Sequence, residues 1–233
     1  MALRKTLMIL LISFCCCLSC NSCLKKGKTV TISTEEIKDR EHQPFLKNDS
    51  ILRVFFSCKT IHEINRFIDP EMGLTILYAN GCYPQYERLD SVSSENVFYN
   101  LPDWLIDNLL YSLNFPNTHI STFQRANMPI FDGETILQYG SFIDESEDKN
   151  IMSKSIQSLI QTSSMENDNE SYLNKLKKDL PYYKDLEKRS IRVVFTDNAS
   201  EKGKYGIRIY HFTEKQDRLY LTLLDFYSID ISV

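Results

Sequence analysis

The sequence predicts an α+β fold, in which N-terminal helices pack on a mainly antiparallel sheet that ends in a three-stranded C-terminal meander. Helical spacing of apolar residues begins near residue 50, whereas the C-terminal third is rich in β-formers. Residues 190–196, 206–213 and 218–228 are three β-rich runs joined by short polar connections, which favour antiparallel pairing. Helices first and strands last indicate helices packed on one face of the sheet.

Two short helices are expected at the start of the folded domain. Apolar residues spaced three and four apart predict a helix over 50–58, capped by Asp49 or Ser50. The residues of this stripe are Ile51, Val54, Phe55 and Cys58. A second helix is expected from Thr60, because Glu63 three residues later completes the pattern of a capping box.

A β-hairpin is predicted next. Residues 74–78 are rich in β-branched and aromatic side chains, and Asn80-Gly81 is a strong two-residue turn signal. Residues 83–89 can then return as the partner strand.

Three longer helices are expected between the hairpin and the C-terminal strands. The first covers 100–113, with Asn100 as its cap. The others cover 151–163 and 169–188. Pro181 lies inside the last of these and predicts a kink or a division there.

The last predicted strand is apolar on both faces. Strict alternation would place one set of side chains on each face. These sets are Leu219, Leu221 and Leu223 on one side and Tyr220, Thr222 and Leu224 on the other. Such a strand is expected in the centre of the sheet or under helices.

The N-terminus has the layout of a secretory signal. Arg4 and Lys5 precede an apolar run over 7–18. The run is shorter than the roughly 20 residues that span a bilayer as a helix. We therefore expect three segments, namely a signal peptide (1–19), a polar tether (20–48) and one α+β domain (49–233).

The end of the apolar run, Leu18-Ser19-Cys20, resembles the lipobox of bacterial lipoproteins. In that family the cysteine becomes the new N-terminus and is acylated. The resemblance implies that Cys20 carries lipid and holds the protein on a membrane of the bacterial cell envelope, at the outer membrane or the periplasmic face. Cys17 stands where that family usually has Leu.

Two looser stretches resemble elements of uncharacterised exported bacterial lipoproteins. One is the Phe-Ile-x-Pro-x-x-Gly pattern over 67–73, and the other covers 212–225. That group implies no activity that could be carried over.

Composition and motifs exclude several classes of function. The net charge of -4 shows no basic excess, so no nucleic-acid partner is expected. Cys20 and Cys23 have the spacing of one zinc-ligand pair, but no second pair follows, so no metal site is expected. Phosphate-binding, dinucleotide-binding and HExxH motifs are absent, and no cofactor is expected.

Four residues of the domain are candidates for sites. Export to an oxidising compartment makes Cys58 and Cys82 a candidate disulfide pair, with two buried thiols as the alternative. His211 and Asp225 fall on neighbouring predicted strands, where a histidine with a carboxylate partner could act as a general base. The alternative is a structural pair.

Two hypotheses for function remain open at this point. The first is a membrane-anchored binding or structural lipoprotein, in which tyrosines spread across loops and element ends suit recognition of a carbohydrate or a peptide. The alternative for these tyrosines is packing in an aromatic-rich core. The second is an exported hydrolase with its site between sheet and helices. The sequence alone does not decide whether the protein is an enzyme.

Overall fold

The computed structural model describes most of the chain beyond residue 44. The described ranges are 45–93, 101–114, 122–127, 138–146, 149–166, 170–197 and 206–229. All described helices and strands belong to the unit Pro44–Val233. Cys20, the predicted signal peptide and most of the predicted tether lie outside the described residues. No helix in the described ranges is both long and apolar enough to cross a membrane.

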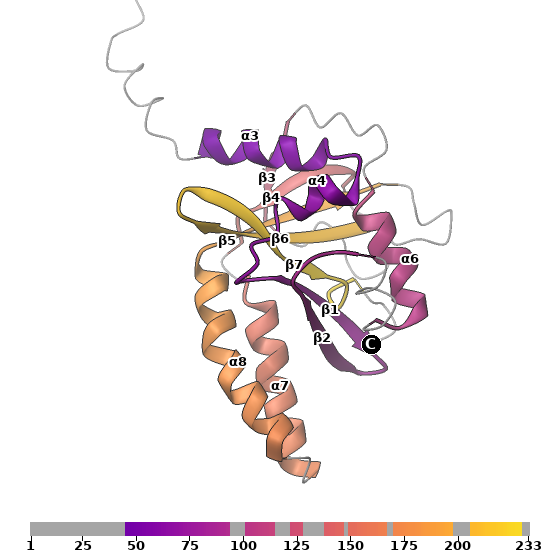
Figure 1. Ribbon diagram of the computed structural model, residues 1–233, viewed down its shortest axis with the longest axis vertical. Coiled ribbons are helices and arrows are strands. Elements are labelled where there is room, and N and C mark those ends of the chain that lie inside the picture. Colours follow the sequence, from indigo (N-terminus) through magenta and orange to yellow (C-terminus); the bar gives the residue numbers. More distant parts are fainter. Residues whose placement is uncertain are drawn as a thin grey trace, which may run out of the picture. The chain divides into compact units, whose positions relative to one another are not determined.

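A seven-stranded sheet with the order β2-β1-β7-β6-β5-β4-β3 forms the centre of this unit, which confirms the α+β class (Figure 1). The strands are β1 (Leu74–Asn80), β2 (Tyr83–Leu89), β3 (Gln124–Ala126), β4 (Gly140–Asp144), β5 (Ser190–Thr196), β6 (Ile207–Lys215) and β7 (Arg218–Asp225). Neighbours are antiparallel, apart from the parallel pairs β1–β7 and β3–β4. The predicted C-terminal meander is confirmed as β5-β6-β7.

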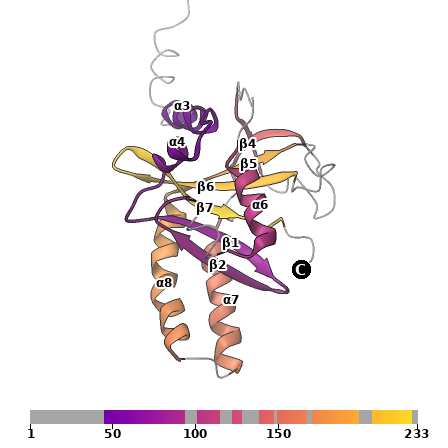
Figure 2. The same ribbon diagram turned by 45° about the vertical axis from the view of Figure 1, so that its right-hand side comes forward.

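Helices cover both faces of the sheet, whereas the sequence indicated only one. The helices are α3 (Phe45–Phe56), α4 (Ile61–Asn65), α6 (Asp103–Ser112), α7 (Ile151–Glu166) and α8 (Glu170–Lys188). Figures 1 and 2 show α3 and α4 above the strands and the α7–α8 pair below them. In β1, Leu74 and Ile76 belong to the apolar core that the sheet forms with α3, α4 and α6. Leu77 belongs to the core that the sheet forms with α7 and α8. Both faces are apolar, so both must be covered.

Strand β7 lies between β1 and β6, which confirms the prediction of a central strand. Its register with β6 shifts, because Phe212 pairs with Leu221 but His211 pairs with Leu223. Thr222 is therefore the extra residue of a β-bulge, which reverses the alternation of side chains beyond it. The prediction that Leu223 shares a face with Leu221 is wrong for this reason, since Leu223 belongs to the core under α7 and α8.

The sequence predicted the start of α4 more accurately than the start and the buried face of α3. The capping box of α4 is confirmed, because Thr60 Oγ1 accepts from Glu63 N at 3.2 Å and Glu63 Oε2 accepts from Thr60 N at 3.1 Å. Helix α3 begins at Phe45, before the predicted caps Asp49 and Ser50. The predicted apolar face of α3 is also wrong at Val54, whose side chain is 58% exposed.

The buried face of α3 is set by an aromatic cluster. Phe55 and Phe56 pack edge-on against Tyr210 and Phe212 of β6, with ring centroids 5.0–6.3 Å apart. Edge-to-face pairs of this kind add to the free energy of apolar burial. Burying both phenylalanines rotates the helix and leaves Val54 on the outer side.

Two further helix predictions need correction. Helix α6 begins at Asp103 with Pro102 as its cap residue, and Pro102 makes no side-chain capping bond. The predicted cap Asn100 lies outside the described residues. Helix α8 continues through Pro181 without dividing. Tyr182 and Tyr183 hold the helix on the sheet at this point, through bonds to Met72 O at 3.1 Å and to Thr75 Oγ1 at 2.8 Å.

Candidate functional site

A groove with a volume of about 380 Å³ opens between α3, α4 and the start of β7. We call it the α3–α4–β7 groove. Helix α3 supplies Ile51 and Val54, and Phe67 follows α4. Strand β7 supplies Leu219. The volume falls within the range of small-ligand pockets, so the groove is large enough to hold a ligand.

The positions of α3, α4 and the start of β7 form the three walls of the groove. Because α3 buries Leu52, Phe55 and Phe56, Val54 of its other side faces outward. The third wall follows the β6–β7 turn, where Gln216 and Asp217 both have positive φ. Two successive left-handed residues make a tight hairpin turn, which brings Arg218 and Leu219 to the groove.

The charged side chains of the groove leave it positive. Glu63 Oε2 accepts from Lys59 N at 2.7 Å and from Thr60 N, and these bonds lower the pKa of Glu63. The positive charge of Arg66 also lowers the pKa of Glu63, so the groove is lined by two cations and one anion. Arg66 and Arg218 are exposed, and neither has an ion-pair partner within 4.0 Å among the described residues. Two cations without a carboxylate partner thus border apolar walls.

The two candidate cysteines are both free, so the predicted disulfide is not formed. Cys58 lines the groove with Leu219, whereas Cys82 is exposed in the β1–β2 turn. The parallel register pairs Thr75 with Leu223, so Leu219 lies before the start of β1 and Cys82 lies beyond its end. A strand of this length spans about 20 Å, whereas a disulfide requires Cα atoms within about 7 Å. Burial raises the pKa of the Cys58 thiol, which disfavours the nucleophilic thiolate.

His211 lies under α7 and α8, in the interior. Its side chain is 1% exposed, and neither ring nitrogen has a hydrogen-bond partner in the described part of the chain. Burial, with smaller contributions from Arg192 and Lys149, lowers the pKa of His211 to about 3. The cavity beside it measures about 10 Å³, which is too small for a substrate.

Asp225 is buried as well, but it bonds to Ser228 instead of His211. Its carboxylate accepts from Ser228 N at 2.9 Å and from Ser228 Oγ at 2.6 Å. Burial raises the pKa of Asp225, and the bonds from Ser228 act in the opposite direction. No hydrogen bond or ion pair between His211 and Asp225 is found in the described residues, and neither side chain is open to solvent.

A buried ion pair that the sequence did not reveal stands beside His211. Arg192, the cross-strand neighbour of His211 on β5, donates to Asp144 on β4 and, at 3.0 Å, to Ser146 Oγ. Asp144 is fully buried. Because a buried carboxylate requires such partners, we assign this pair to the support of the sheet.

A second hollow, of about 280 Å³, lies next to this pair. Most of its charges are matched within the fold, since Arg125 pairs with Asp49 at 3.7 Å and with Glu145 at 3.3 Å, and Asp144 pairs with Arg192. Lys149 is the remaining charged residue of its lining. A hollow whose charges neutralise one another offers less to a charged ligand than the α3–α4–β7 groove does.

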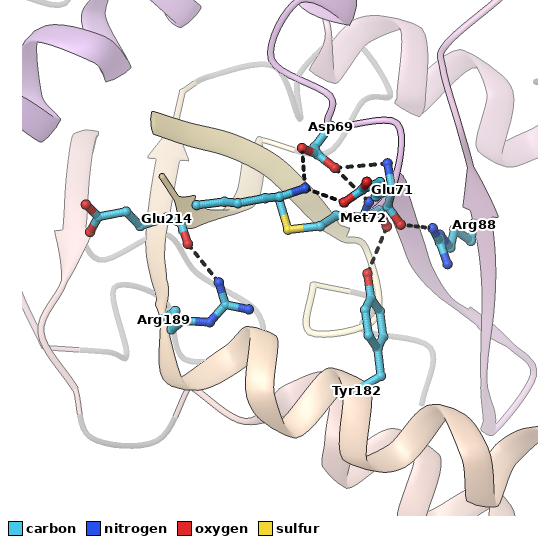
Figure 3. A network of polar contacts seen from close by, with 8 residues as sticks. Asp69, Glu71, Met72, Arg88, Tyr182, Arg189 and Glu214 are labelled. Atoms are coloured by element: carbon cyan, nitrogen blue, oxygen red, sulfur yellow. Dashed lines mark hydrogen bonds and ion pairs between the residues drawn. The ribbon is translucent and has the colours of Figure 1, made fainter. Parts of the chain in front are cut away.

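A polar network ties the β6–β7 hairpin to the loop after α4 (Figure 3). Lys215 Nζ donates to Asp69 Oδ2 at 2.9 Å and to Glu71 Oε2 at 2.7 Å, and these bonds raise the pKa of Lys215. Asp69 Oδ1 in turn accepts from Met72 N at 3.0 Å. A lysine held in its charged form is not a nucleophile. The network instead fixes the hairpin that carries Arg218, the cross-strand partner of Lys215.

No protein-family model, curated protein or solved structure matches the chain. Within the described residues, no three His, Cys, Asp or Glu side chains are grouped as metal ligands would be. The groove residues Arg66 and Arg218 were not found from the sequence, because they are far apart in the chain and carry no motif.

Proposed function

We propose that the protein is a lipid-anchored binding module of a bacterial cell envelope, with its ligand in the α3–α4–β7 groove. One observation carries the binding part of this proposal. Arg66 and Arg218, which have no ion-pair partners among the described residues, border a hollow with apolar walls. Apolar walls with a few polar groups that orient the ligand are typical of ligand sites.

The anchoring part of the proposal rests on the sequence. The positive start, the short apolar run and Leu18-Ser19-Cys20 together resemble a lipoprotein signal. Acylation of Cys20 would attach the domain to the membrane through a lipid, since lipid chains bind membranes in proportion to their buried length.

The hydrolase hypothesis depended on His211 and Asp225, and the observed geometry favours binding over hydrolysis. A general base must come within hydrogen-bond reach of a substrate proton. His211 and Asp225 are each 1% exposed, and the adjoining cavity measures about 10 Å³. Neither residue lines the groove.

Replacement of Cys20 tests the anchor. The Cys20→Ser chain, expressed in a Gram-negative host with a labelled fatty acid, is expected to lose the label and to leave the membrane fraction. Cys23→Ser is the matched control, and it is expected to keep both. Persistence of the label in Cys20→Ser with its loss in Cys23→Ser would move the modified residue to Cys23. Unchanged labelling and fractionation in both variants would contradict the anchoring proposal.

A further inference from the structure

We infer that one internal water molecule binds between His211 of β6 and Glu187 of α8, where it accepts from the imidazole N–H and donates to the carboxylate. The site lies in the core that the sheet forms with α7 and α8, away from the α3–α4–β7 groove. The inference therefore goes beyond the proposed function, and neither depends on the other. Three observations carry it: a buried histidine ring, a cavity of the size of one water beside it, and a buried carboxylate in the same cavity wall.

The ring of His211 makes no hydrogen bond within the described part of the chain. Its side chain is 1% exposed, and neither Nδ1 nor Nε2 has a partner among the described residues. The low pKa of His211 keeps the ring neutral at pH 7, and a neutral imidazole carries one N–H donor and one acceptor nitrogen. Buried polar groups are nearly always bonded, either to the protein or to an internal water. The ring therefore requires a partner that the described side chains do not supply.

The cavity beside the ring has the size of one water. It measures about 10 Å³, and a single water requires roughly 10 to 15 Å³ together with about two to four polar partners. The polar side chains of the wall include Glu187, Ser190, His211 and Thr222. Cavities that stay dry are apolar, so a wall with this many polar groups favours water. The size excludes a larger ligand.

Glu187 presents a carboxylate to the same cavity. Its side chain is buried, and Oε1 accepts from Met152 N at 2.7 Å and from Ser153 N at 3.1 Å. These bonds cap the first turn of α7, where a negative charge is favoured by the helix dipole. An ionised carboxylate has about four acceptor positions on its two oxygens. The carboxylate can therefore accept from a water in addition to the two backbone groups.

The chemistry of the two side chains sets the direction of the hydrogen bonds. A carboxylate only accepts, so the water must donate to Glu187, and its oxygen is then free to accept from the N–H of His211. Hydrogen bonds in such a chain polarise and strengthen one another. The hydroxyls of Ser190 and Thr222 are already bonded to other protein groups. The water thus joins β6 to α8 and, through the cap, to the start of α7.

Nuclear magnetic resonance of the His211 ring tests the inference. The full chain, purified from whichever cell fraction contains it and carrying isotope-labelled histidine, is studied at pH 7. We expect a ring N–H resonance with a dipolar cross-peak to water, which a rotating-frame experiment distinguishes from proton exchange by its sign. The resonance is expected to be absent from His211→Leu. It should be retained in the matched control His62→Gln, because His62 is exposed on α4.

Two substitutions of Glu187 test the second contact of the water. Glu187→Gln keeps an acceptor oxygen and is expected to keep the cross-peak. Glu187→Met lacks such an oxygen and is expected to lose the cross-peak. Circular dichroism shows whether each variant is folded. Where Glu187→Met does not fold, a crystal structure of the parent chain decides. It is expected to show one water at about 2.7 to 3.2 Å from a ring nitrogen of His211 and from an oxygen of Glu187.

Three results would overturn the inference. A ring N–H resonance of His211 with dipolar cross-peaks to protein protons alone would show that the N–H does not donate to a water. Absence of any ring N–H resonance from His211 would show that the ring exchanges with bulk solvent. An unchanged cross-peak in folded Glu187→Met, or a crystal water bonded to His211 without Glu187, would exclude the carboxylate as the second partner. None of these results concerns the groove, so failure of this inference and failure of the proposed function are distinguishable.

Discussion

A chain that ends at Arg218 is expected to show no cooperative unfolding transition. Strand β7 lies between β1 and β6, so its removal separates the β1–β2 hairpin from the rest of the sheet. Leu221 is fully buried, and Leu224 is 1% exposed. Each buried leucine contributes roughly 1.5 to 3 kcal/mol, and domains are stable by only about 5 to 15 kcal/mol. Loss of several such residues and of two hydrogen-bonded ladders exceeds that margin.

Thermal unfolding followed by circular dichroism measures this effect. A chain that ends at Ile229 is the matched control, because it keeps all of β7 together with Phe226 and Ile229, both buried. The control is expected to unfold sharply, near the temperature of the full chain. A sharp transition in the chain that ends at Arg218 would show that β7 is not required for the core.

Neutral burial of His211 is expected to make the protein less stable in acid. The pKa of His211 is about 3 in the folded state, against an ordinary value of 6.5. Below pH 6.5 the unfolded chain takes up a proton that the folded protein excludes. The free energy of unfolding therefore keeps its full contribution from neutral His211 above pH 6.5. Below that pH this contribution falls by about 1.4 kcal/mol for each pH unit, down to about pH 3.

Other ionisable groups near His211 also change the stability with pH, so its contribution must be measured as a difference between two chains. Glu187 of α8 lines the same small cavity, and Arg192 and Lys149 act on His211 through their charge. The pKa of Asp225 is raised, so its protonation favours the folded state as the pH falls and opposes the effect of His211. Comparison of the parent chain with His211→Leu removes the contributions that the two chains share.

Urea unfolding at pH 7 and pH 4.5 measures the difference. The parent is expected to lose about 2 to 3 kcal/mol more than His211→Leu between these two conditions. His62 is exposed on α4, so His62→Gln should keep the parent's pH dependence. Equal losses in the parent and His211→Leu would show that His211 is protonated in the folded protein.

Local sequence signals predicted the elements that they govern directly. Strand β5 has the predicted bounds Ser190–Thr196, because its β-rich run lies between the charged residues Lys188-Arg189 and the polar residues that begin at Asp197. The Thr60–Glu63 capping box formed as predicted, since its bonds join residues within one turn.

Features set by contacts distant in the chain were not predicted. The rotation of α3 depends on Tyr210 and Phe212 of β6, and no periodicity within α3 reveals them. The bulge at Thr222 is a property of the β6–β7 pairing. The second layer of helices arises because both faces of β7 are apolar, which the sequence showed without assigning the cover to α7 and α8.

Packing between residues far apart in the chain also determines which residues form the candidate site. His211 and Asp225 were conspicuous as a histidine and a carboxylate on neighbouring strands, but both are buried under helices. Arg66 and Arg218 come together because the loop after α4 reaches β7 through the bond from Leu221 N to Phe67 O. No spacing rule joins residues so far apart in the chain.

Amide hydrogen exchange with and without an acidic probe peptide, Glu-Leu-Glu-Leu-Glu-amide, tests most directly that the α3–α4–β7 groove with its two arginines is the binding site. The full chain is exchanged alone and with saturating peptide, and protection is located by mass spectrometry. Binding in the groove predicts slower exchange over 51–58, 63–67 and 218–220, and no change in the hollow around Arg125 and Glu145. Protection confined to that second hollow, or spread over α7 and α8 with none at 218–220, would contradict the assignment of the groove.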